Sequence, residues 1–524
     1  MRTDRRIPAV RAATPALLVA AALLAIAGVL VALPGAAHAA AAKPAKPNIV
    51  VIMTDDQRTD DLGPMPQTRK LIAGQGVTFD RSYVNFPLCC PSRATFLTGQ
   101  YAHNHRVLFN FSPIGGYYQF KGQNNALPVW LKRAGYSTHL LGKYLNEYGE
   151  RNPREIPPGW TDWFGMVDPS TYGYFGYSVN DNGKVRTYGT ATADYQTDVL
   201  ATRAVKVIRE GKSSRKPFFM WLTPTAPHTV AVKEHGRAEG TPAVPAPRDA
   251  KVYANAPIRR TPSFDEADFS DKPALLKIAF ADRLTPPIVD SLTAHYRGRL
   301  GSLLAVDDAV ARIVRELKRT GQLNNTVLIF TSDNGWIIGE HRLYQHPTPT
   351  NWTGVKFFGF EEATRVPLMI RGPGFTGGRR VGSPVINADI APTITRLAGA
   401  TAGRVTDGVP LQDIMKAPKR WADRNLLIET RRYPKYGAVF DYRLIHTLRY
   451  HLEVGQAQPQ EGGPLIPFSE LYDLKRDPYE LRNVSGTPAY AAVEAALNAR
   501  LKTLQDCKGP SCRQPAARLP EPGQ

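Results

Sequence analysis

The chain has 524 residues, of which 43% are hydrophobic and 21% are charged. This length and composition suit one or more large folded cores and exclude a mainly disordered chain. The formal net charge of +20 favours anionic partners. No dense run of Lys and Arg with interleaved aromatic residues occurs, so we predict no nucleic-acid partner.

The first 39 residues have the layout of an export signal. Four arginines, two of them the pair Arg5-Arg6, precede a long apolar run that ends in the small-x-small pattern Ala37-His38-Ala39. An uncleaved membrane anchor is the alternative, because the run approaches the roughly 20 apolar residues of a spanning helix. Pro34 and Gly35 favour cleavage, which would remove four arginines and one aspartate and leave a net charge of +17.

Because no second stretch is apolar enough to span a bilayer, we predict an exported protein without stable membrane insertion. It would be periplasmic, cell-wall-associated or extracellular.

Three short apolar stretches predict buried strands with polar residues at their carboxyl ends: 46–57, 217–228 and 326–335. Helical patterns lie between them, at 127–135, 197–211 and 302–321. Strands that alternate with helices predict an α/β fold with a mostly parallel sheet flanked by helices. Ligands of such sheets bind beyond the carboxyl ends of the strands.

The later part of the chain predicts a smaller second domain. Residues 229–290 are rich in Pro, Ala and charge, and we interpret them as a surface excursion that can act as a lid. From about residue 404 the pattern changes to antiparallel strands and a final helix. We therefore predict a catalytic domain over 44–403, a C-terminal α+β subdomain over 404–512 and a disordered tail over 513–524.

Cys507 and Cys512 flank a Gly-Pro turn near the C-terminus. In an exported protein this spacing favours a short-loop disulfide. A zinc site would need further Cys or His residues nearby, and the sequence has none there.

Two strand ends carry paired oxygen ligands, Asp55-Asp56 and Asp333-Asn334. Four such ligands without sulfur suit a hard divalent cation, Ca²⁺ or Mg²⁺. The alternative is that these residues only begin turns after their strands.

Cys89 and Cys90 are adjacent and directly precede Pro-Ser-Arg. Vicinal cysteines are poorly placed for an ordinary disulfide. Pro91 favours the first turn of a short helix over 91–99, which places Cys89 at a helix N-terminus with Arg93 one turn away. The dipole there favours an anion or a nucleophile. A pair of buried thiols is the alternative.

The stretch "CCPSRATFLTG" resembles the sulfatase signature, Cys-x-Pro-Ser-Arg followed by Leu-Thr-Gly. Other stretches within 46–485 are similar to further motifs of that family, in the family's order: "NIVVIMTDDQ", "GKYLNEYG", "PTAPH", "SDNGWIIGEHRL", "VKFFGFEEATRVPLMIRGPG" and "ELYDLKRDPYELRN". "CCPSR", "HNH" and "GKYLNEYG" most resemble the N-acetylglucosamine-6-sulfatase and extracellular heparan endosulfatase branch. "GEHRL" and "FEEATRVPL" are more similar to bacterial arylsulfatase-type members. The resemblance implies an alkaline-phosphatase-like fold.

The resemblance also implies roles for individual residues. Cys89 would be converted to formylglycine (3-oxoalanine) by a formylglycine-generating enzyme, and Cys90 would be the variable position of the signature. The implied Ca²⁺ ligands, with Mg²⁺ less favoured, are Asp55, Asp56, Asp333, Asn334 and the modified Cys89. Arg93 and Lys143 match the residues that hold the formylglycine hydrate. His228 and Lys356 match those that grip the sulfate and handle the leaving oxygen.

Two features depart from the family pattern. Leu145 stands where many sulfatases have a histidine that acts on the hydrate, so the base of the last step is unassigned. His103, His105 and His341 are candidates, and each also has a structural interpretation. The stretch 344–354 is longer than in some relatives, so the assignment of Lys356 depends on the register of the following "FEEATRVPL".

We therefore predict hydrolysis of sulfate monoesters. The substrate would be a sulfated carbohydrate such as 6-O-sulfo-N-acetylglucosamine, or an aryl sulfate. Two alternatives stay open, a phosphonate or phosphate ester hydrolase of the same fold and a catalytically silent glycan-binding homologue.

Overall fold

The computed structural model describes residues 46–230, 240–280, 282–344, 355–433, 440–458, 462–513, 515 and 517–523. The predicted export signal and nearly all of 344–354 lie outside these residues. Among the described helices, none is both long and apolar enough to cross a membrane.

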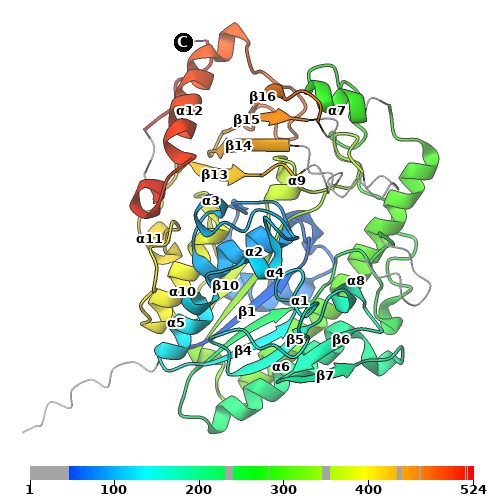
Figure 1. Ribbon diagram of the computed structural model, residues 1–524, viewed down its shortest axis with the longest axis vertical. Coiled ribbons are helices and arrows are strands. Elements are labelled where there is room, and N and C mark those ends of the chain that lie inside the picture. The colour runs from blue at the N-terminus through cyan, green and yellow to red at the C-terminus, as the bar shows by residue number, and fades with distance from the viewer. Residues whose placement is uncertain are drawn as a thin grey trace, which may run out of the picture. The chain divides into compact units, whose positions relative to one another are not determined.

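A ten-stranded sheet forms the centre of the fold, in the order β11-β2-β10-β9-β1-β8-β4-β5-β6-β7 (Figure 1). Its strands are β1 (Asn48–Thr54), β2 (Val77–Phe79), β4 (Ser137–Gly142), β5 (Asp162–Met166), β6 (Ser178–Asp181), β7 (Lys184–Thr187), β8 (Phe218–Thr223), β9 (Thr326–Ser332), β10 (Leu368–Arg371) and β11 (Arg379–Val381). The five neighbours β9, β1, β8, β4 and β5 are parallel. The three predicted strands are thus confirmed as β1, β8 and β9, side by side in a mostly parallel sheet.

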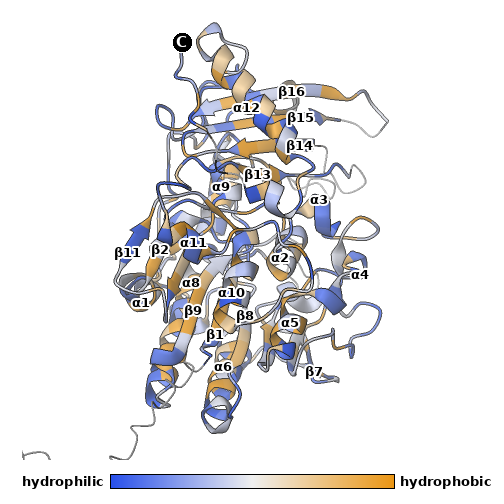
Figure 2. Cartoon of the chain, turned by 90° about the vertical axis from the view of Figure 1, so that its left-hand side faces the viewer, coloured by the Kyte–Doolittle hydropathy of each residue, from blue (hydrophilic) through white to orange (hydrophobic). Residues whose placement is uncertain are grey.

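Helices cover both faces of this sheet. Helices α6 (Gln196–Ser213) and α8 (Pro286–Arg319) share one buried cluster with Val50 and Ile52 of β1. Helices α2 (Cys89–Thr98), α5 (Leu127–Arg133) and α10 (Ile390–Ala398) share the other cluster with the alternate β1 side chains. Side chains that alternate between two covered faces are mostly apolar, which explains the continuous apolar run within β1. In Figure 2, β1, β8 and β9 have the orange of hydrophobic residues, whereas α6 and α8 carry both orange and blue.

Two predicted helices begin earlier than expected. Helix α8 starts at Pro286 rather than at residue 302, because two prolines occupy its first turn and fix a helical start. The predicted surface excursion therefore ends in a helix, and it also contains α7 (Ala274–Ala279). Helix α2 starts at Cys89 rather than at Pro91 and ends before Gly99, whose φ is +66°.

The C-terminal part contains a four-stranded antiparallel sheet, as predicted. Its strands are β13 (Leu426–Glu429), β14 (Phe440–His446), β15 (Tyr450–Ala457) and β16 (Ile466–Asp473), in that order. Helix α12 (Ala491–Leu504) packs on β14 and β15 (Figure 1). The predicted Cys507–Cys512 disulfide is confirmed. Part of the predicted disordered tail makes contacts, since Glu521 forms an ion pair with Arg449.

The remaining helices and strands are short. They are α1 (Pro66–Leu71), β3 (Ser82–Tyr83), α3 (Ala102–His105), α4 (Gly116–Gln119), α9 (Glu361–Thr364), β12 (Val385–Ile386) and α11 (Leu411–Lys416). Strands β3 and β12 pair in parallel as a separate two-stranded sheet.

Candidate active site

The two pairs of predicted metal ligands lie at neighbouring strand ends. Thr54 of β1 is in register with Ser332 of β9, so the chain leaves both strands at the same edge of the sheet. The Asp56 backbone N–H donates to Asp333 Oδ1 at 3.0 Å, and Asn334 Nδ2 donates to Asp56 Oδ1 at 2.6 Å. The structure therefore brings these four oxygen-bearing residues, Asp55 included, into one buried group.

Cys89 is the first residue of α2 and faces this group. Its Sγ lies 3.4 Å from Asp55 Oδ1, 3.7 Å from Asp56 Oδ1 and 3.3 Å from Lys356 Nζ. Burial raises the pKa of the Cys89 thiol well above its ordinary value, and the nearby lysines offset only part of that effect. Cys90 instead packs in the apolar cluster beneath α2. The two adjacent cysteines therefore have different environments, and Cys89 is the one at the acids.

Two cationic side chains hold the acids from the α2 and β4 sides. Arg93 Nε lies 2.7 Å from Asp333 Oδ2, and its Nη2 lies 3.8 Å from Asp55 Oδ2. Lys143, directly after β4, donates from Nζ to Asp55 Oδ2 at 2.6 Å. Burial alone would lower the pKa of Lys143, but Asp55 and its neighbours raise it well above its ordinary value. Both side chains are therefore charged at neutral pH.

Lys356 and His228 contact Asp56 from the other side. Lys356 Nζ lies 3.1 Å from both carboxylate oxygens of Asp56, and His228 Nε2 lies 3.3 Å from Oδ2. The His228 Nδ1–H donates to the Thr229 carbonyl at 2.6 Å, which fixes the ring with Nε2 toward the site. Burial lowers the pKa of His228, despite the opposing effect of the acids.

The donor set fits a hard divalent cation. Three buried carboxylates, Asp55, Asp56 and Asp333, converge, and one ligand atom from each of the first two lies within 4.8 Å of Cys89 and His228 ligand atoms. Asn334 Oδ1 is buried and has no hydrogen-bond partner among the described residues. An acceptor amide oxygen of this kind beside carboxylates is what Ca²⁺ or Mg²⁺ binds.

Three residues that the sequence did not single out also shape the site. The Tyr172 ring lies 4.7 Å from Lys143 Nζ and 4.4 Å from the His228 ring, and the Trp336 ring lies 5.1 Å from Lys356 Nζ. Arg299 Nη2 donates to the Asp56 carbonyl at 2.7 Å. Trp336 lies within the motif "SDNGWIIGEHRL", whereas Tyr172 and Arg299 lie in segments without a family motif.

The three histidines considered as bases have other partners. His103 contacts Glu429 and the Cys507 carbonyl, His105 contacts Thr95, and His341 contacts Glu266. In the hydrogen bonds and ion pairs of the described residues, none of the three contacts Cys89 or the acids beside it. Leu145 is buried in the core.

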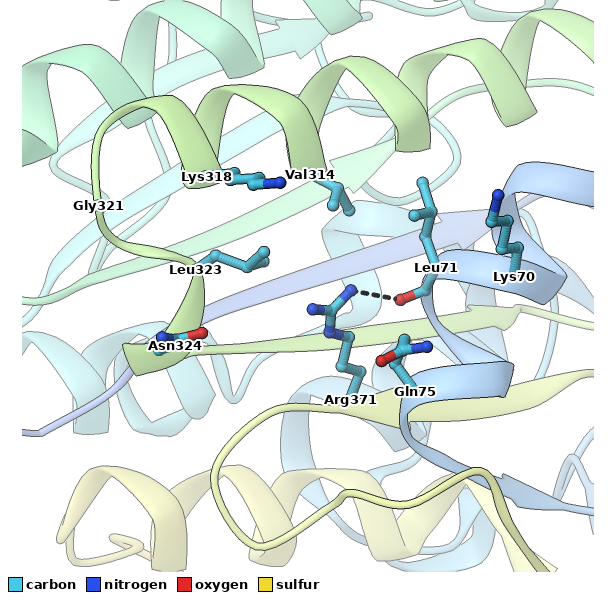
Figure 3. Close-up of a pocket in the computed structure, with 9 residues that line it drawn as sticks. All are labelled: Lys70, Leu71, Gln75, Val314, Lys318, Gly321, Leu323, Asn324 and Arg371. Atoms are coloured by element: carbon cyan, nitrogen blue, oxygen red, sulfur yellow. Dashed lines mark hydrogen bonds between the residues drawn. The ribbon is translucent and has the colours of Figure 1, made fainter.

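A separate cavity of about 410 Å³ lies away from this group (Figure 3). Its lining includes Lys70, Lys318 and Arg371, and the Arg371 guanidinium donates to the Leu71 carbonyl at 2.7 Å. Residue 371 ends β10, which runs antiparallel to β9, and Leu323 and Asn324 in the lining precede β9. The cavity is therefore at the opposite edge of the sheet from Asp333.

Comparison with known proteins supports one family. The model of the sulfatase family matches residues 47–400, and that of the C-terminal region of N-sulphoglucosamine sulphohydrolase matches residues 351–507. The chain is 34% identical to an arylsulfatase of Volvox carteri, over 92% of this chain and 78% of that one. It is 32% identical to human N-acetylglucosamine-6-sulfatase, over 91% of this chain and 87% of that one.

Solved structures share the fold. A structure described as a complex with its substrate D-glucosamine-2-N,6-O-disulfate has a TM-score of 0.69 at 24% identity, with 88% of this chain and 97% of that chain covered. Phosphonate monoester hydrolase of Agrobacterium radiobacter has a TM-score of 0.63 at 22% identity, with 88% and 95% covered. The family matches cover most of the chain, including the strand ends and the helix that carry the acids and Cys89. The chain therefore belongs to the sulfatase family, whose members hydrolyse sulfate esters.

Proposed function

We propose that this protein is an exported, Ca²⁺-dependent sulfatase that uses a formylglycine made from Cys89. The observation that carries the proposal is the position of Cys89 Sγ, between Asp55 Oδ1 at 3.4 Å and Lys356 Nζ at 3.3 Å, at the start of α2. A nucleophile at that point has acids for a cation on one side and positive charge for an anionic substrate on the other.

Asp55, Asp56, Asp333 and Asn334 would hold the cation. Bound Ca²⁺ would supply a Lewis acid that stabilises negative charge on oxygen at position 89. Formylglycine would supply, as its hydrate, a hydroxyl nucleophile at position 89, which beside a cation is a better nucleophile than a serine hydroxyl. The three carboxylates are matched in number by Arg93, Lys143 and Lys356, so a bound divalent cation makes the site net positive and suited to a sulfate monoester.

The cationic side chains and His228 would carry out the remaining steps of the reaction. Arg93, Lys143 and Lys356 would stabilise the charge that develops on the sulfuryl oxygens. His228 Nε2 would donate a proton to the leaving alcohol oxygen. Burial keeps the pKa of His228 low, and an incoming sulfate anion raises it again, so substrate binding favours the acid form.

The modifying enzyme would act before the chain folds. Cys89 and Arg93 of the signature are fully buried in the folded protein. We therefore infer that a formylglycine-generating enzyme reads the unfolded segment, and that its co-expression is needed for an active preparation.

The adjacent cysteines give a matched test. We expect Cys89→Ser to lower kcat/KM on an aryl sulfate on the order of 10³-fold or more, because it removes the modification target. Cys90→Ala should keep the activity and lose at most about 1–2 kcal/mol of stability. Peptide mass spectrometry across residue 89 should find the aldehyde in wild type and in Cys90→Ala. An active protein with only unmodified cysteine at position 89 would refute the mechanism.

For the substrate, we propose a sulfated carbohydrate with a 6-O-sulfated glucosamine unit. The human relative at 32% identity is an N-acetylglucosamine-6-sulfatase, whereas the Volvox relative at 34% is an arylsulfatase. A panel of sulfated monosaccharides, glycosaminoglycan oligomers and aryl sulfates, compared by kcat/KM, tests the choice. The substrate proposal is wrong if an aryl sulfate is the best substrate of the panel.

A second candidate function is phosphonate ester hydrolysis, because a phosphonate monoester hydrolase shares the fold over most of both chains. Kinetics on matched aryl sulfate and aryl phosphonate esters separate the two functions. We expect the sulfate ester to react faster, and a large preference for the phosphonate would reverse the assignment.

Export is the remaining part of the proposal. The N-terminal 39 residues support it, as does the similarity, at 33% identity over 74% of this chain, to an extracellular sulfatase homologue of Drosophila melanogaster. N-terminal sequencing of secreted protein should begin at or near residue 40. An intact N-terminus in the membrane fraction would instead indicate an anchor.

A further inference from the structure

A buried group of ionisable side chains lies where the loops beyond β9 meet the C-terminal sheet. It has six carboxylates, two permanent cations and two histidines: Glu266, Glu340, Glu362, Glu453, Glu470, Glu480, Arg58, Lys272, His341 and His451. All are buried except Glu362, whose side chain is 11% exposed. Such an excess of buried carboxylates is costly unless protons or a cation neutralise it.

Three members of this group converge from three different segments. His341 is in the loop after β9, Glu362 is in α9, and Glu480 is in the turn after β16. One ligand atom from each lies within 4.8 Å of the other two. This group shares no residue with the acids beside Cys89.

The orientation of His341 leaves one ring nitrogen without a partner. Its Nδ1–H donates to Glu266 Oε2 at 2.8 Å, and the other oxygen of Glu266 is 2.9 Å from Lys272 Nζ. The Phe360 ring stacks on the imidazole at 3.8 Å and 15°. The ring is therefore held with Nε2 as an unprotonated acceptor.

This acceptor faces another acceptor. His341 Nε2 lies 4.0 Å from Glu362 Oε2, and neither atom has a hydrogen-bond partner in the described part of the chain. Glu362 Oε1 accepts a bond from Ser263 Oγ, so Oε2 is the oxygen turned into the group. Two lone pairs that face each other in a buried site are stabilised by a cation between them.

We propose that His341, Glu362 and Glu480 form a second metal site, which takes a divalent first-row transition cation and binds Zn²⁺ in preference to Ca²⁺. One imidazole nitrogen with two carboxylate oxygens is a donor set that suits Zn²⁺, whereas Ca²⁺ prefers six or more oxygens. Glu266 behind His341 completes the carboxylate–histidine–metal arrangement that orients a ligating ring.

The site is structural, because its ligands join the loop after β9 and α9 to the C-terminal sheet. Glu480 already contacts both α9 and the C-terminal sheet. Its Oε2 accepts from the Glu361 backbone N–H at 2.9 Å, and its Oε1 accepts from His451 Nδ1 at 2.6 Å on β15. A bound cation would add a third connection between the two parts of the fold.

Calorimetry with Zn²⁺ on the untagged full chain tests the proposal. The protein is first stripped of metal and then held in millimolar Ca²⁺, which fills the oxygen-rich site beside Cys89. We expect one Zn²⁺ per chain under these conditions and a rise in Tm on binding. Glu362→Gln keeps the shape of the side chain but removes its charge, and should weaken Zn²⁺ binding tenfold or more.

Glu361→Gln is the matched control, since Glu361 is the neighbouring carboxylate on α9 but pairs with His446 and Arg365. It should bind Zn²⁺ as wild type does. If Glu362→Gln folds poorly, the visible spectrum of wild type with Co²⁺ in Ca²⁺ excess gives a second readout of imidazole and carboxylate ligation. The proposal is overturned if wild type binds no Zn²⁺ in Ca²⁺ excess, or if Glu362→Gln binds it as tightly as Glu361→Gln.

Discussion

Asp333 has two kinds of partner, and they make its role different from that of Asn334. Its Oδ2 pairs with Arg93 Nε at 2.7 Å, and its Oδ1 accepts from the backbone of Asp56 and Asn334. Arg93 is fully buried, and its other acidic neighbour, Asp55, is already paired with Lys143, so loss of the Asp333 carboxylate leaves an excess of positive charge inside the protein. Breaking such a pair from one side costs about 3–5 kcal/mol. Asn334 carries no such pair.

We therefore expect Asn334→Ala and Asp333→Ala to differ. Both should weaken Ca²⁺ binding at least about tenfold, which is about 1.4 kcal/mol of binding free energy. Only Asp333→Ala should also lower the free energy of unfolding by several kcal/mol, on the order of the broken pair. Calorimetry of Ca²⁺ binding and urea denaturation of the metal-free proteins measure the two effects. Unchanged binding heat in both variants would mean that the cation lies elsewhere.

At the scale of elements, His105 joins α2 to α3. Its Nδ1 accepts from the Val107 backbone N–H at 3.1 Å, so the neutral ring donates from Nε2 to Thr95 Oγ1 at 3.0 Å. Burial is the main cause that lowers the pKa of His105 from 6.5 to about 3. Protonation of Nδ1 would also place its N–H against the Val107 backbone N–H, so that two hydrogen-bond donors would face each other. The neutral ring is therefore part of the packing between the two helices.

This junction predicts a loss of stability in acid. The folded-state pKa lies below the unfolded value, so the unfolded chain binds the extra proton, and stability is lost as pH falls from 6.5 toward 3. Between pH 7 and pH 5 the titration of His105 lowers the free energy of unfolding by about 2 kcal/mol. His105→Gln can keep both hydrogen bonds but has no group that titrates. We therefore expect its free energy of unfolding to fall by about 2 kcal/mol less than that of wild type between pH 7 and pH 5. Urea denaturation at both pH values measures the difference, and equal pH dependence of the two proteins would contradict it.

The elements that sequence could predict are those with local signals. Apolar runs that end in acids predicted β1 and β9, and the paired acids predicted a metal site with a turn role as the alternative, but their spacing could not establish that the two strand ends meet. Tyr172 and Arg299 were missed because their positions at the site depend on how distant segments pass over the sheet. Arg299 lies in the first half of α8, whose apolar spacing is weak and whose start is set by prolines at 286 and 287. Tertiary packing rather than local pattern decides such positions.

At the scale of the whole molecule, the excess of positive charge bears on the substrate. Without residues 1–39 the chain has a net charge of +17, which attracts polyanions over distances of the order of the Debye length, about 10 Å at 0.1 M salt. A chain with many sulfates experiences this field along its length, whereas a monosaccharide with one sulfate experiences it only near the site. Polymer recruitment and local sulfate recognition therefore differ in their dependence on salt.

We expect kcat/KM for a sulfated oligosaccharide to fall about tenfold between low and high ionic strength, at saturating Ca²⁺. The value for a 6-O-sulfated monosaccharide should change much less, because the residues proposed to recognise it, Arg93, Lys143 and Lys356, lie in a buried group that salt screens poorly. An aryl sulfate with one charge is the control for salt effects on the chemical step itself. Parallel salt dependence for all three substrates would show that the surface charge has no part in substrate capture, even if hydrolysis of sulfate esters is unaffected.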